Sequence, residues 1–385
     1  MTIPHIDYHL FGTHVCFGPG CADALRTELD ALGCSRPVVL MQPRMAVSEA
    51  WTRLNQHLGG MQTKVLSDVP NHGSVQWVET AVPELAAFDA DSIVAIGGGS
   101  VSDSAKAVSL LLAEKGRLAD HVTHFRPPAT VDIPRRTHAK LPIVSLPTTA
   151  SGAEVTPSFG AREGDHKLLF WNRQLASTTL LIDPLLSADL PLSLVRYTAM
   201  NGLAHCFEGM YSKNRSLISD GIALQSIELF AQALTDRALS PEEQRWRLLL
   251  AGHLSGVVLS MAKTCLHHAI CHVIGARHNV GHGEVNTIVL PHALRFNEPQ
   301  ARELLDRALK VLNRVSGSHH LHVSDWIANV TDILGLPASL KSLGITENDL
   351  EPIAQQTLQE RGLAFNPRPV TDSEEVLSIL RQAAR

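Results

Sequence analysis

The sequence has no long hydrophobic run, few aromatic residues and little net charge. Although 44% of the 385 residues are apolar, no stretch approaches the ~18 consecutive apolar residues that a membrane-spanning helix needs. The formal net charge is −5 and aromatic residues make up 5%, so the chain lacks the basic surface and the stacking side chains of nucleic-acid-binding proteins. These absences predict a cytoplasmic protein that binds neither membranes nor nucleic acids and acts on a small molecule.

Paired cysteines are missing as well. The six cysteines form no Cys-x-x-Cys pair, and a chain of this length does not need disulfides to stabilise its core. We therefore expect reduced thiols. The length exceeds what one hydrophobic core supports and suits two domains.

Two hydrophobic patterns divide the chain. Short apolar runs alternate with helical stretches in the first half, which is typical of a parallel sheet covered on both faces. These runs are Pro37–Met41, Asp91–Ile96, Leu141–Leu146 and Thr179–Asp183. From about Leu190, apolar residues recur at spacings of three and four, which predicts an all-helical second half. Turn residues between Pro184 and Pro191, with Ser187 as a helix cap, mark the change.

A glycine-rich turn is the first candidate binding site. The segment Gly97-Gly98-Gly99-Ser100 follows an apolar run directly and precedes the helical run Val101–Glu114. Residues without Cβ let the backbone approach a pyrophosphate, and the free N–H groups and dipole of the helix start favour an anion. We predict a coenzyme phosphate here; a tight turn before an ordinary capped helix is the alternative.

Four nearby side chains extend this site. Asp103 and Lys106 lie one to two helical turns beyond the glycines, which suits a ribose contact from Asp103 and a structural ion pair from Lys106. Thr148 and Thr149 follow the run that ends at Leu146. Because ligands of open parallel sheets bind at the carboxyl ends of strands, we expect these threonines at the adenine or ribose. A serine/threonine turn without a ligand is equally compatible.

Histidine is present in excess. The chain has 20 histidines, and six lie within 26 residues, where even spreading would give one or two. These six are His267, His268, His272, His278, His282 and His292. Residues four apart share a helix face, so His268 pairs with His272, and Asn201 pairs with His205. Two such pairs, with His282 from a following loop, are typical of a metal or proton-transfer site; separate structural histidines are the alternative.

Four segments together resemble the signatures of the iron-containing alcohol dehydrogenase superfamily, in the same order. They are GGGSVSDSAK (Gly97–Lys106), LPTTASGAEVTP (Leu146–Pro157), MNGLAHCFEG (Met200–Gly209) and HHAICHVIGARHNVGHGEVNTIVLPH (His267–His292). The resemblance implies the fold class α/β plus all-α: a Rossmann-like dinucleotide-binding domain at residues 1–188, a helical catalytic domain at residues 189–385 and an active site in the cleft between them. It also implies a dimer or larger homo-oligomer.

The resemblance carries a departure in the metal ligands. The superfamily holds a divalent metal with one aspartate and three histidines, and these positions fall here on Asn201, His205, His268 and His282. An amide oxygen carries no formal charge and is a poor ligand for iron or zinc. We therefore expect these residues to hold a metal weakly or not at all.

With asparagine at position 201, the sequence is similar to the maleylacetate reductase branch of the superfamily. Members of this branch reduce a conjugated double bond with NADH or NADPH, generally without a tightly held metal. They take part in the degradation of aromatic compounds. The segments GAEVTPSFG and LHHAICHVIG also resemble this branch, whereas GHGEVNTIVLPH departs towards the metal-dependent enzymes. Arg277 and His278 stand where the branch has less basic residues. We expect this pair to face the substrate pocket and suit an anionic substrate; a solvated turn is the alternative.

Together these residues predict hydride transfer from a reduced nicotinamide to an activated double bond or carbonyl. His272 is the leading proton donor or hydrogen-bond donor, and His205, His268 and His282 orient the substrate or bind a metal. Lys167 lies where family members often place a lysine near the nicotinamide, a surface lysine being the alternative. Because Gln42-Pro43-Arg44 ends the first predicted strand without an acidic residue, NADH and NADPH both remain open.

Three other hypotheses stay open. The first is an iron- or zinc-dependent alcohol or aldehyde dehydrogenase with Asn201 as a weak fourth ligand. The second is a lyase of the dehydroquinate synthase-like type, in which NAD is retained and recycled. The third is a non-enzymatic dinucleotide-binding regulator. Metal content, net coenzyme consumption and turnover distinguish them.

Overall fold

The computed structural model describes residues 12–126 and 130–385. A parallel six-stranded sheet lies in the N-terminal half, with the strand order β1-β10-β7-β4-β2-β3. Its strands are β1 (His14–Phe17), β2 (Pro37–Met41), β3 (Lys64–Leu66), β4 (Ser92–Gly97), β7 (Ile143–Pro147) and β10 (Thr179–Ile182). The four predicted strands are present. The sequence pattern missed β1 and β3 because these edge strands are half exposed and lack a continuous apolar run.

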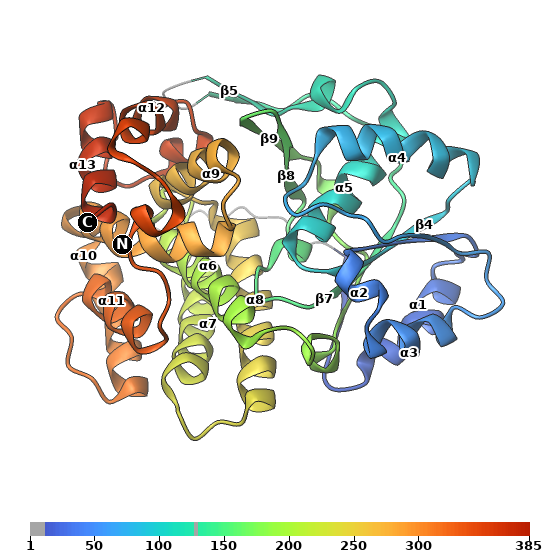
Figure 1. Ribbon diagram of the computed structural model, residues 1–385, viewed down its shortest axis with the longest axis horizontal. Coiled ribbons are helices and arrows are strands. Elements are labelled where there is room, and N and C mark those ends of the chain that lie inside the picture. The colour runs from blue at the N-terminus through green and yellow to red at the C-terminus, as the bar shows by residue number, and fades with distance from the viewer. Residues whose placement is uncertain (1–11, 127–129) are drawn as a thin grey trace.

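Helices cover both faces of this sheet, as Figure 1 shows for α4 and α5 on one side and α1 and α3 on the other. Alternate side chains of a strand serve the two faces: Val38 and Leu40 pack in the core under α4 and α5, and Val39 and Met41 pack in the core under α1 and α3. The helices are η1 (Cys21–Ala24), α1 (Leu25–Ala31), α2 (Pro43–Ala46), α3 (Glu49–His57), α4 (Val75–Ala87), α5 (Gly99–Glu114), η2 (Leu118–His121), η3 (Ala153–Val155), η4 (Arg173–Leu175) and η5 (Pro184–Ser187).

Two antiparallel hairpins were not predicted. They are β5 (His124–Arg126) with β6 (Thr130–Asp132), and β8 (Ser158–Glu163) with β9 (His166–Trp171). Phe159 and Phe170 stack across the second hairpin with ring centroids 4.5 Å apart and join the core beneath α5. This packing places β9, which carries Lys167, beside the sheet.

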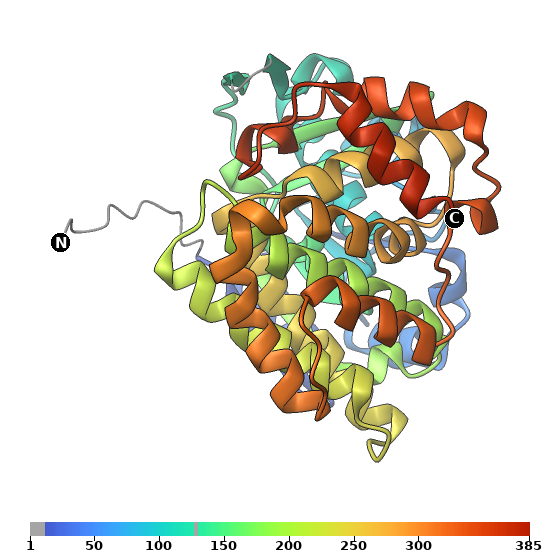
Figure 2. The same cartoon turned by 90° about the vertical axis from the view of Figure 1, so that its left-hand side faces the viewer.

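The second half of the described chain consists of helices, as predicted (Figure 2). They are α6 (Leu192–Tyr211), α7 (Leu217–Thr235), α8 (Pro241–Ala262), α9 (Leu266–His278), α10 (His282–Ser316), α11 (Val323–Ile333), η6 (Leu340–Leu343), α12 (Glu347–Thr357), η7 (Arg361–Phe365) and α13 (Ser373–Ala383). No single described helix is long and apolar enough to cross a membrane; α8 and α9 meet those criteria only as a pair bent by 107°.

The change from sheet to helices lies between β10 and α6. The exact division at residue 188 stays a prediction. The expected cap at Ser187 is wrong: Ser187 is the last residue of η5 and its hydroxyl donates a hydrogen bond to the carbonyl of Pro184. Pro191 instead occupies the N-cap of α6.

Glycines let the two halves approach closely. A Cβ on Gly252 of α8 would lie 2.6 Å from Cα of Ala150, and one on Gly256 would overlap the carbonyl of Gly152. Ala150 and Gly152 belong to the loop after β7. The threonine loop of the sheet therefore rests directly on the backbone of α8, which fixes the relative position of the two halves.

Candidate active site

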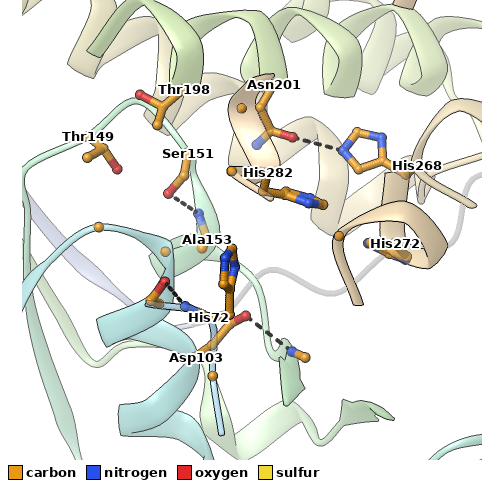
Figure 3. Close-up of a pocket in the computed structure, with 18 of the residues that line it drawn as sticks. His72, Asp103, Thr149, Ser151, Ala153, Thr198, Asn201, His268, His272 and His282 are labelled. Carbon is orange, nitrogen blue, oxygen red and sulfur yellow. Dashed lines mark hydrogen bonds between the residues drawn. The ribbon is translucent and has the colours of Figure 1, made fainter. Parts of the chain in front are cut away.

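One cavity of about 800 Å³ is lined by residues of both halves (Figure 3). It brings together all five predicted catalytic residues and all but one of the predicted coenzyme-binding residues. The first half contributes Gly98, Gly99, Ser100, Asp103, Thr148, Thr149 and Lys167, and the helical half contributes Asn201, His205, His268, His272 and His282. Gly97 lines the adjoining cavity of about 370 Å³ with Thr148 and Arg44. The roles of these residues stay predictions.

The glycine turn fits a coenzyme phosphate. Gly98 is the N-cap of α5 and no side chain caps this helix within the described residues. A Cβ on Gly98 would lie 2.9 Å from Oγ1 of Thr149, so any larger residue would fill the cradle. The Thr149 hydroxyl is buried without a hydrogen-bond partner among the described residues. Unpaired helix N–H groups and an unpaired hydroxyl around one concave space are suited to phosphate and ribose oxygens.

Asp103 makes a structural contact in addition to lining the cavity. Its carboxylate accepts a hydrogen bond from the backbone N–H of Gly160 at 3.2 Å, which ties the β8–β9 hairpin to α5. Burial raises the pKa of Asp103. Lys106 has the expected structural role: its Nζ lies 4.0 Å from Asp103 and donates hydrogen bonds to the carbonyls of Ala153 and Ser158.

The histidine pairs lie on facing helices as predicted, since Asn201 and His205 come from α6 and His268 and His272 come from α9. The His268 ring centroid lies 4.7 Å from that of His205 and 6.3 Å from that of His282. The His272 and His282 rings stack at 5.7 Å. The expectation of a loop at His282 is wrong, because His282 is the first residue of α10.

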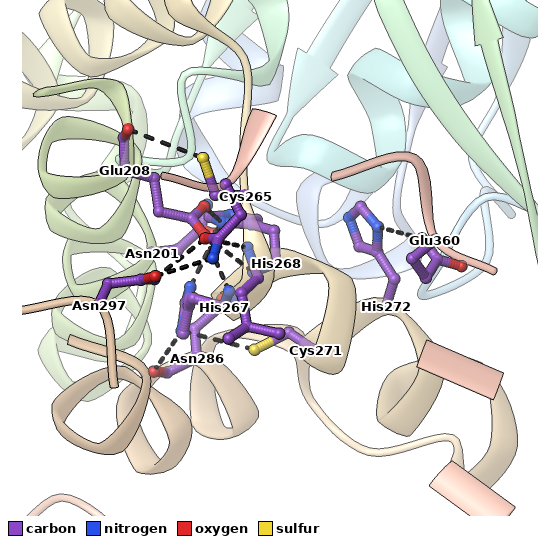
Figure 4. A network of polar contacts seen from close by, with 12 residues as sticks. Asn201, Glu208, Cys265, His267, His268, Cys271, His272, Asn286, Asn297 and Glu360 are labelled. Atoms are coloured by element: carbon purple, nitrogen blue, oxygen red, sulfur yellow. Dashed lines mark hydrogen bonds and ion pairs between the residues drawn. The ribbon is translucent and has the colours of Figure 1, made fainter. Parts of the chain in front are cut away.

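Glu208 is a site residue that sequence reasoning missed (Figure 4). One of its oxygens lies 2.5 Å from Nδ1 of His268, and the other accepts hydrogen bonds from the backbone N–H groups of His267 and His268 at 2.9 and 3.4 Å. This carboxylate therefore caps the start of α9 and orients the His268 ring. Burial raises the pKa of Glu208 to about 7. One feature of the sequence could have identified Glu208: it is a carboxylate within the long apolar stretch of α6, three residues after His205.

Glu360 was missed as well. Its Oε2 lies 3.4 Å from Nδ1 of His272 across the cavity wall. Burial raises the pKa of Glu360 to about 7, against the opposing effects of Lys167 and Arg361. Nothing in the sequence pairs residues that are 88 positions apart.

Burial dominates the electrostatics of the cluster. It lowers the pKa of His268 to about 3, with Lys167 as the next cause, and it lowers the pKa values of His272 and His282 well below the usual range, again with Lys167 next. The pKa of Lys167 is itself lowered by burial, although Asp103 and Glu360 oppose this shift. Lys167 lines the cavity together with these three histidines, so the alternative of a surface lysine does not hold.

The residues present do not fit a tightly held metal. Nε2 of His268 lies 3.0 Å from Oδ1 of Asn201, an uncharged oxygen that stands where the family has a carboxylate. The contact of Nδ1 with Glu208 is compatible with a bound metal or with none. Among the described residues, the three potential ligand atoms within 4.8 Å of one another belong to Glu208, His267 and His268, which already bond to each other or to backbone. A metal on His205, His268 and His282 stays a prediction that this geometry does not favour.

The expected basic pair does not face the cavity. Arg277 is exposed and donates to Oε1 of Gln356, and neither Arg277 nor His278 lines the pocket. Other cations do. The pocket-lining cations are Arg44, Arg162, Lys167, Lys263 and Arg361. Lysine and arginine side chains outnumber the lining carboxylates, Asp103 and Glu284, so the cavity suits anionic ligands.

Comparison with known proteins identifies relatives over the whole chain. The maleylacetate reductase 1 of Cupriavidus pinatubonensis is 30% identical, covering 99% of this chain and 97% of that protein. The crystal structure of maleylacetate reductase from Agrobacterium tumefaciens superposes with a TM-score of 0.81 at 25% identity, over 99% of each chain. An archaeal alcohol dehydrogenase from a Red Sea brine pool shares the fold, with a TM-score of 0.91 at 19% identity over 100% of each chain.

Family models agree with these relatives. Residues 12–184 match the model of iron-containing alcohol dehydrogenases, and residues 195–384 match that of the C-terminal part of the same family. The match covers the glycine turn, the threonine loop and the histidine helices. The chain therefore belongs to the iron-containing alcohol dehydrogenase family and is an NAD(P)-dependent oxidoreductase.

Proposed function

We propose that the protein is a reductase that transfers hydride from NADH or NADPH to an activated double bond or carbonyl of a small carboxylated substrate. Relatives that match nearly the whole chain are named maleylacetate reductases, which supports this proposal. One observation carries the proposal: the uncapped glycine turn and the histidine cluster line the same cavity. A coenzyme bound by its phosphates at the turn would extend towards the histidines.

The chain's own residues account for coenzyme binding. When bound, the reduced nicotinamide supplies the hydride. The N–H groups at the start of α5 bind the pyrophosphate, and the unpaired hydroxyl of Thr149 bonds to a coenzyme oxygen. Arg44 follows β2, where a carboxylate would select the ribose 2′-hydroxyl, so NADPH is accepted as well as NADH.

His272 stabilises the charge that develops on the substrate oxygen. Hydride addition to a conjugated acceptor moves negative charge onto the neighbouring carbonyl oxygen, where a positioned donor lowers the barrier. Because the pKa of His272 is lowered well below its usual range, its ring is neutral near pH 7 and carries one N–H. Burial raises the pKa of Glu360 to about 7, so a protonated Glu360 donates to Nδ1 and leaves the ring proton on Nε2, where it acts as a hydrogen-bond donor and not as an imidazolium acid. Lys167, which lines the same cavity and has its pKa lowered by burial, is then the better proton source.

One observation favours a second candidate, a metal-dependent alcohol dehydrogenase. Nδ1 of His205 is buried and has no hydrogen-bond partner among the described residues. A ring nitrogen without a partner is available to a ligand. Iron or zinc bound stoichiometrically after purification, with activity lost on chelation, would support this candidate.

The test is to follow oxidation of NADH and NADPH with maleylacetate, related keto acids and simple aldehydes, each with and without chelator. We expect chelator-resistant turnover that is fastest with carboxylated substrates. Turnover of simple alcohols and aldehydes alone, lost with chelator, would replace the proposal with the metal-dependent candidate. Net coenzyme consumption would exclude a lyase that recycles its NAD.

Three finer expectations belong to the same proposal. They are a homodimer or larger homo-oligomer, a cytoplasmic location and a place in the degradation of aromatic compounds. Sedimentation velocity measures the first directly. An anionic substrate is supported by the excess of lysine and arginine around the cavity.

A further inference from the structure

We propose that Lys263 and Arg361 form a carboxylate-binding subsite on the helical side of the cavity, which selects substrates that carry a carboxylate away from the reacting carbon. This inference rests on the proposed reductase function and assigns its substrate preference to two specific residues. Both line the cavity, and neither lies in the four segments that carry the family resemblance.

Lys263 is held in an unusual backbone conformation. It is the C-cap of α8, with φ of 69° and ψ of 164°, in a region that favours glycine. Its Nζ donates to the carbonyl of Ser260 at 2.9 Å, which leaves two of the three N–H donors of the ammonium group. Strained non-glycine residues persist mainly where a side chain is needed at a functional site.

Arg361 is brought beside Lys263 by close backbone packing. It begins η7, and a Cβ on the next residue, Gly362, would lie 2.5 Å from the carbonyl oxygen of Cys265, in the turn between α8 and α9. The Arg361 side chain makes no hydrogen bond or salt bridge with any described residue. Both side chains line the same cavity, and burial, followed by the charge of Arg361, lowers the pKa of Lys263 to about 8.

The neighbouring carboxylates are engaged elsewhere. Glu360 lies against Nδ1 of His272, although its charge also favours the charged form of Arg361. Asp103 accepts from Gly160 and lies near Lys106. Two adjacent, largely desolvated cations with free donors are stabilised by an anion between them, and a carboxylate fits this arrangement.

The subsite also lies within reach of the reaction centre. Glu360, the residue before Arg361, has its Oε2 3.4 Å from Nδ1 of His272, and His272 and Arg361 line the same cavity, so a short substrate can meet both side chains. With a carbonyl oxygen at His272 and a carboxylate at Arg361 and Lys263, binding energy from the remote group orients the reacting carbon.

The experiment compares two aldehydes that differ in one carboxylate, succinic semialdehyde and butanal, in addition to maleylacetate. We expect Arg361→Gln and Lys263→Gln each to lower kcat/KM for the carboxylated substrates at least about tenfold, mainly by raising KM. The kcat/KM for butanal should change by less than about threefold. Arg277→Gln, which removes an exposed charge outside the cavity, is the matched control and should change neither. Lys263→Gly should behave as Lys263→Gln does while relieving the backbone, so a loss of preference cannot be attributed to unfolding.

If the ratio of kcat/KM for the carboxylated substrates to kcat/KM for butanal is the same in the Arg361 and Lys263 variants as in the wild type, the subsite is overturned and the reductase function is left intact. If the wild type reduces none of the substrates, the reductase function fails instead. The subsite is then judged by calorimetric titration of succinate into enzyme saturated with NADP⁺. Binding by the wild type that is lost in Arg361→Gln supports it, and no binding by the wild type overturns it.

Discussion

At the residue scale, the proposed coenzyme site depends on the absence of a side chain at Gly98. Gly98 leaves room beside the Thr149 hydroxyl at the start of α5, and an alanine there would place a Cβ 2.9 Å from Oγ1. We expect Gly98→Ala to raise the Kd for NADPH at least about tenfold, because the methyl group occupies phosphate space. Fluorescence titration of the coenzyme measures this change.

The matched control is Gly221→Ala, on α7. A Cβ there meets nothing within 4 Å, so this variant should bind NADPH normally. It should gain about 0.5–1 kcal/mol in stability, because alanine is the better helix former. Normal NADPH binding by Gly98→Ala would place the coenzyme phosphate elsewhere.

In the proposed mechanism, His272 is the residue on which the chemistry most depends. Removing one donor from a developing oxyanion typically costs about 10²-fold or more in kcat. We expect His272→Ala to show this loss with little change in the Kd for NADPH, and His272→Gln to recover part of the activity because its amide can still donate. Single-turnover measurement of coenzyme oxidation separates the chemical step from release. A variant with unchanged turnover would remove His272 from the mechanism.

Residues that carry local patterns could be found from the sequence, whereas isolated residues could not. The glycine turn is contiguous, and the histidine pairs repeat at the helical spacing. Glu208 meets His268 across 60 positions, and η7, which begins at Arg361, packs through Gly362 on Cys265 in the turn after α8. Such contacts are products of tertiary packing and have no local signature.

At the scale of elements, Glu208 joins α6 to α9. Its carboxylate accepts from the first N–H groups of α9 and fixes the ring of His268. We expect Glu208→Ala to lower the free energy of unfolding by about 2–4 kcal/mol, since it leaves buried donors unpaired. Glu208→Gln keeps an acceptor oxygen and should lose less. Urea unfolding monitored by circular dichroism measures both; equal stability of the alanine variant and wild type would contradict the capping role.

The same scale shows which elements a sequence pattern can predict. β2, β4, β7 and β10 are buried runs and were predicted, whereas β1 and β3 are half-exposed edges. The β8–β9 hairpin depends on pairing between strands and on its packing against α5, which no single-strand pattern reports. The sequence pattern therefore placed Lys167 in the correct stretch of the chain but did not predict strand β9, which carries it.

At the scale of the whole molecule, the cavity depends on how closely the threonine loop rests on α8. Adding a methyl group at Gly256 would overlap the carbonyl of Gly152 and come within 2.9 Å of Val155 Cγ2. We expect Gly256→Ala to cost about 1–3 kcal/mol of stability, as overpacking does, and to weaken NADPH binding although it touches no coenzyme. If Gly256→Ala changes neither the free energy of unfolding nor the Kd for NADPH, the threonine loop can shift to accommodate the methyl group while the two halves keep their relative position.

The buried histidines set how stability depends on pH. Burial lowers the pKa of His267 to about 4 and that of His268 to about 3, and it lowers the pKa of His253, which lies on α8 away from the cavity lining. Between these values and the ordinary 6.5, the folded state binds fewer protons than the unfolded chain. Stability from these groups is therefore complete above pH 6.5 and is lost as the pH falls through that window.

Four buried carboxylates act in the opposite direction, and one of them is Asp103, whose pKa is raised by burial. The pKa values of Glu154, Glu208 and Glu360 are raised from 4.5 to about 7, so their contribution to stability falls as the pH rises between those values. Because eight histidines have lowered pKa values and four carboxylates have raised ones, we expect the free energy of unfolding to decrease on going from about pH 7 to about pH 5. Urea unfolding at several pH values measures the slope, and His253→Gln should flatten it without altering the active site. A slope of the opposite sign would mean that the carboxylates dominate and that the histidine rings are better solvated than their burial indicates.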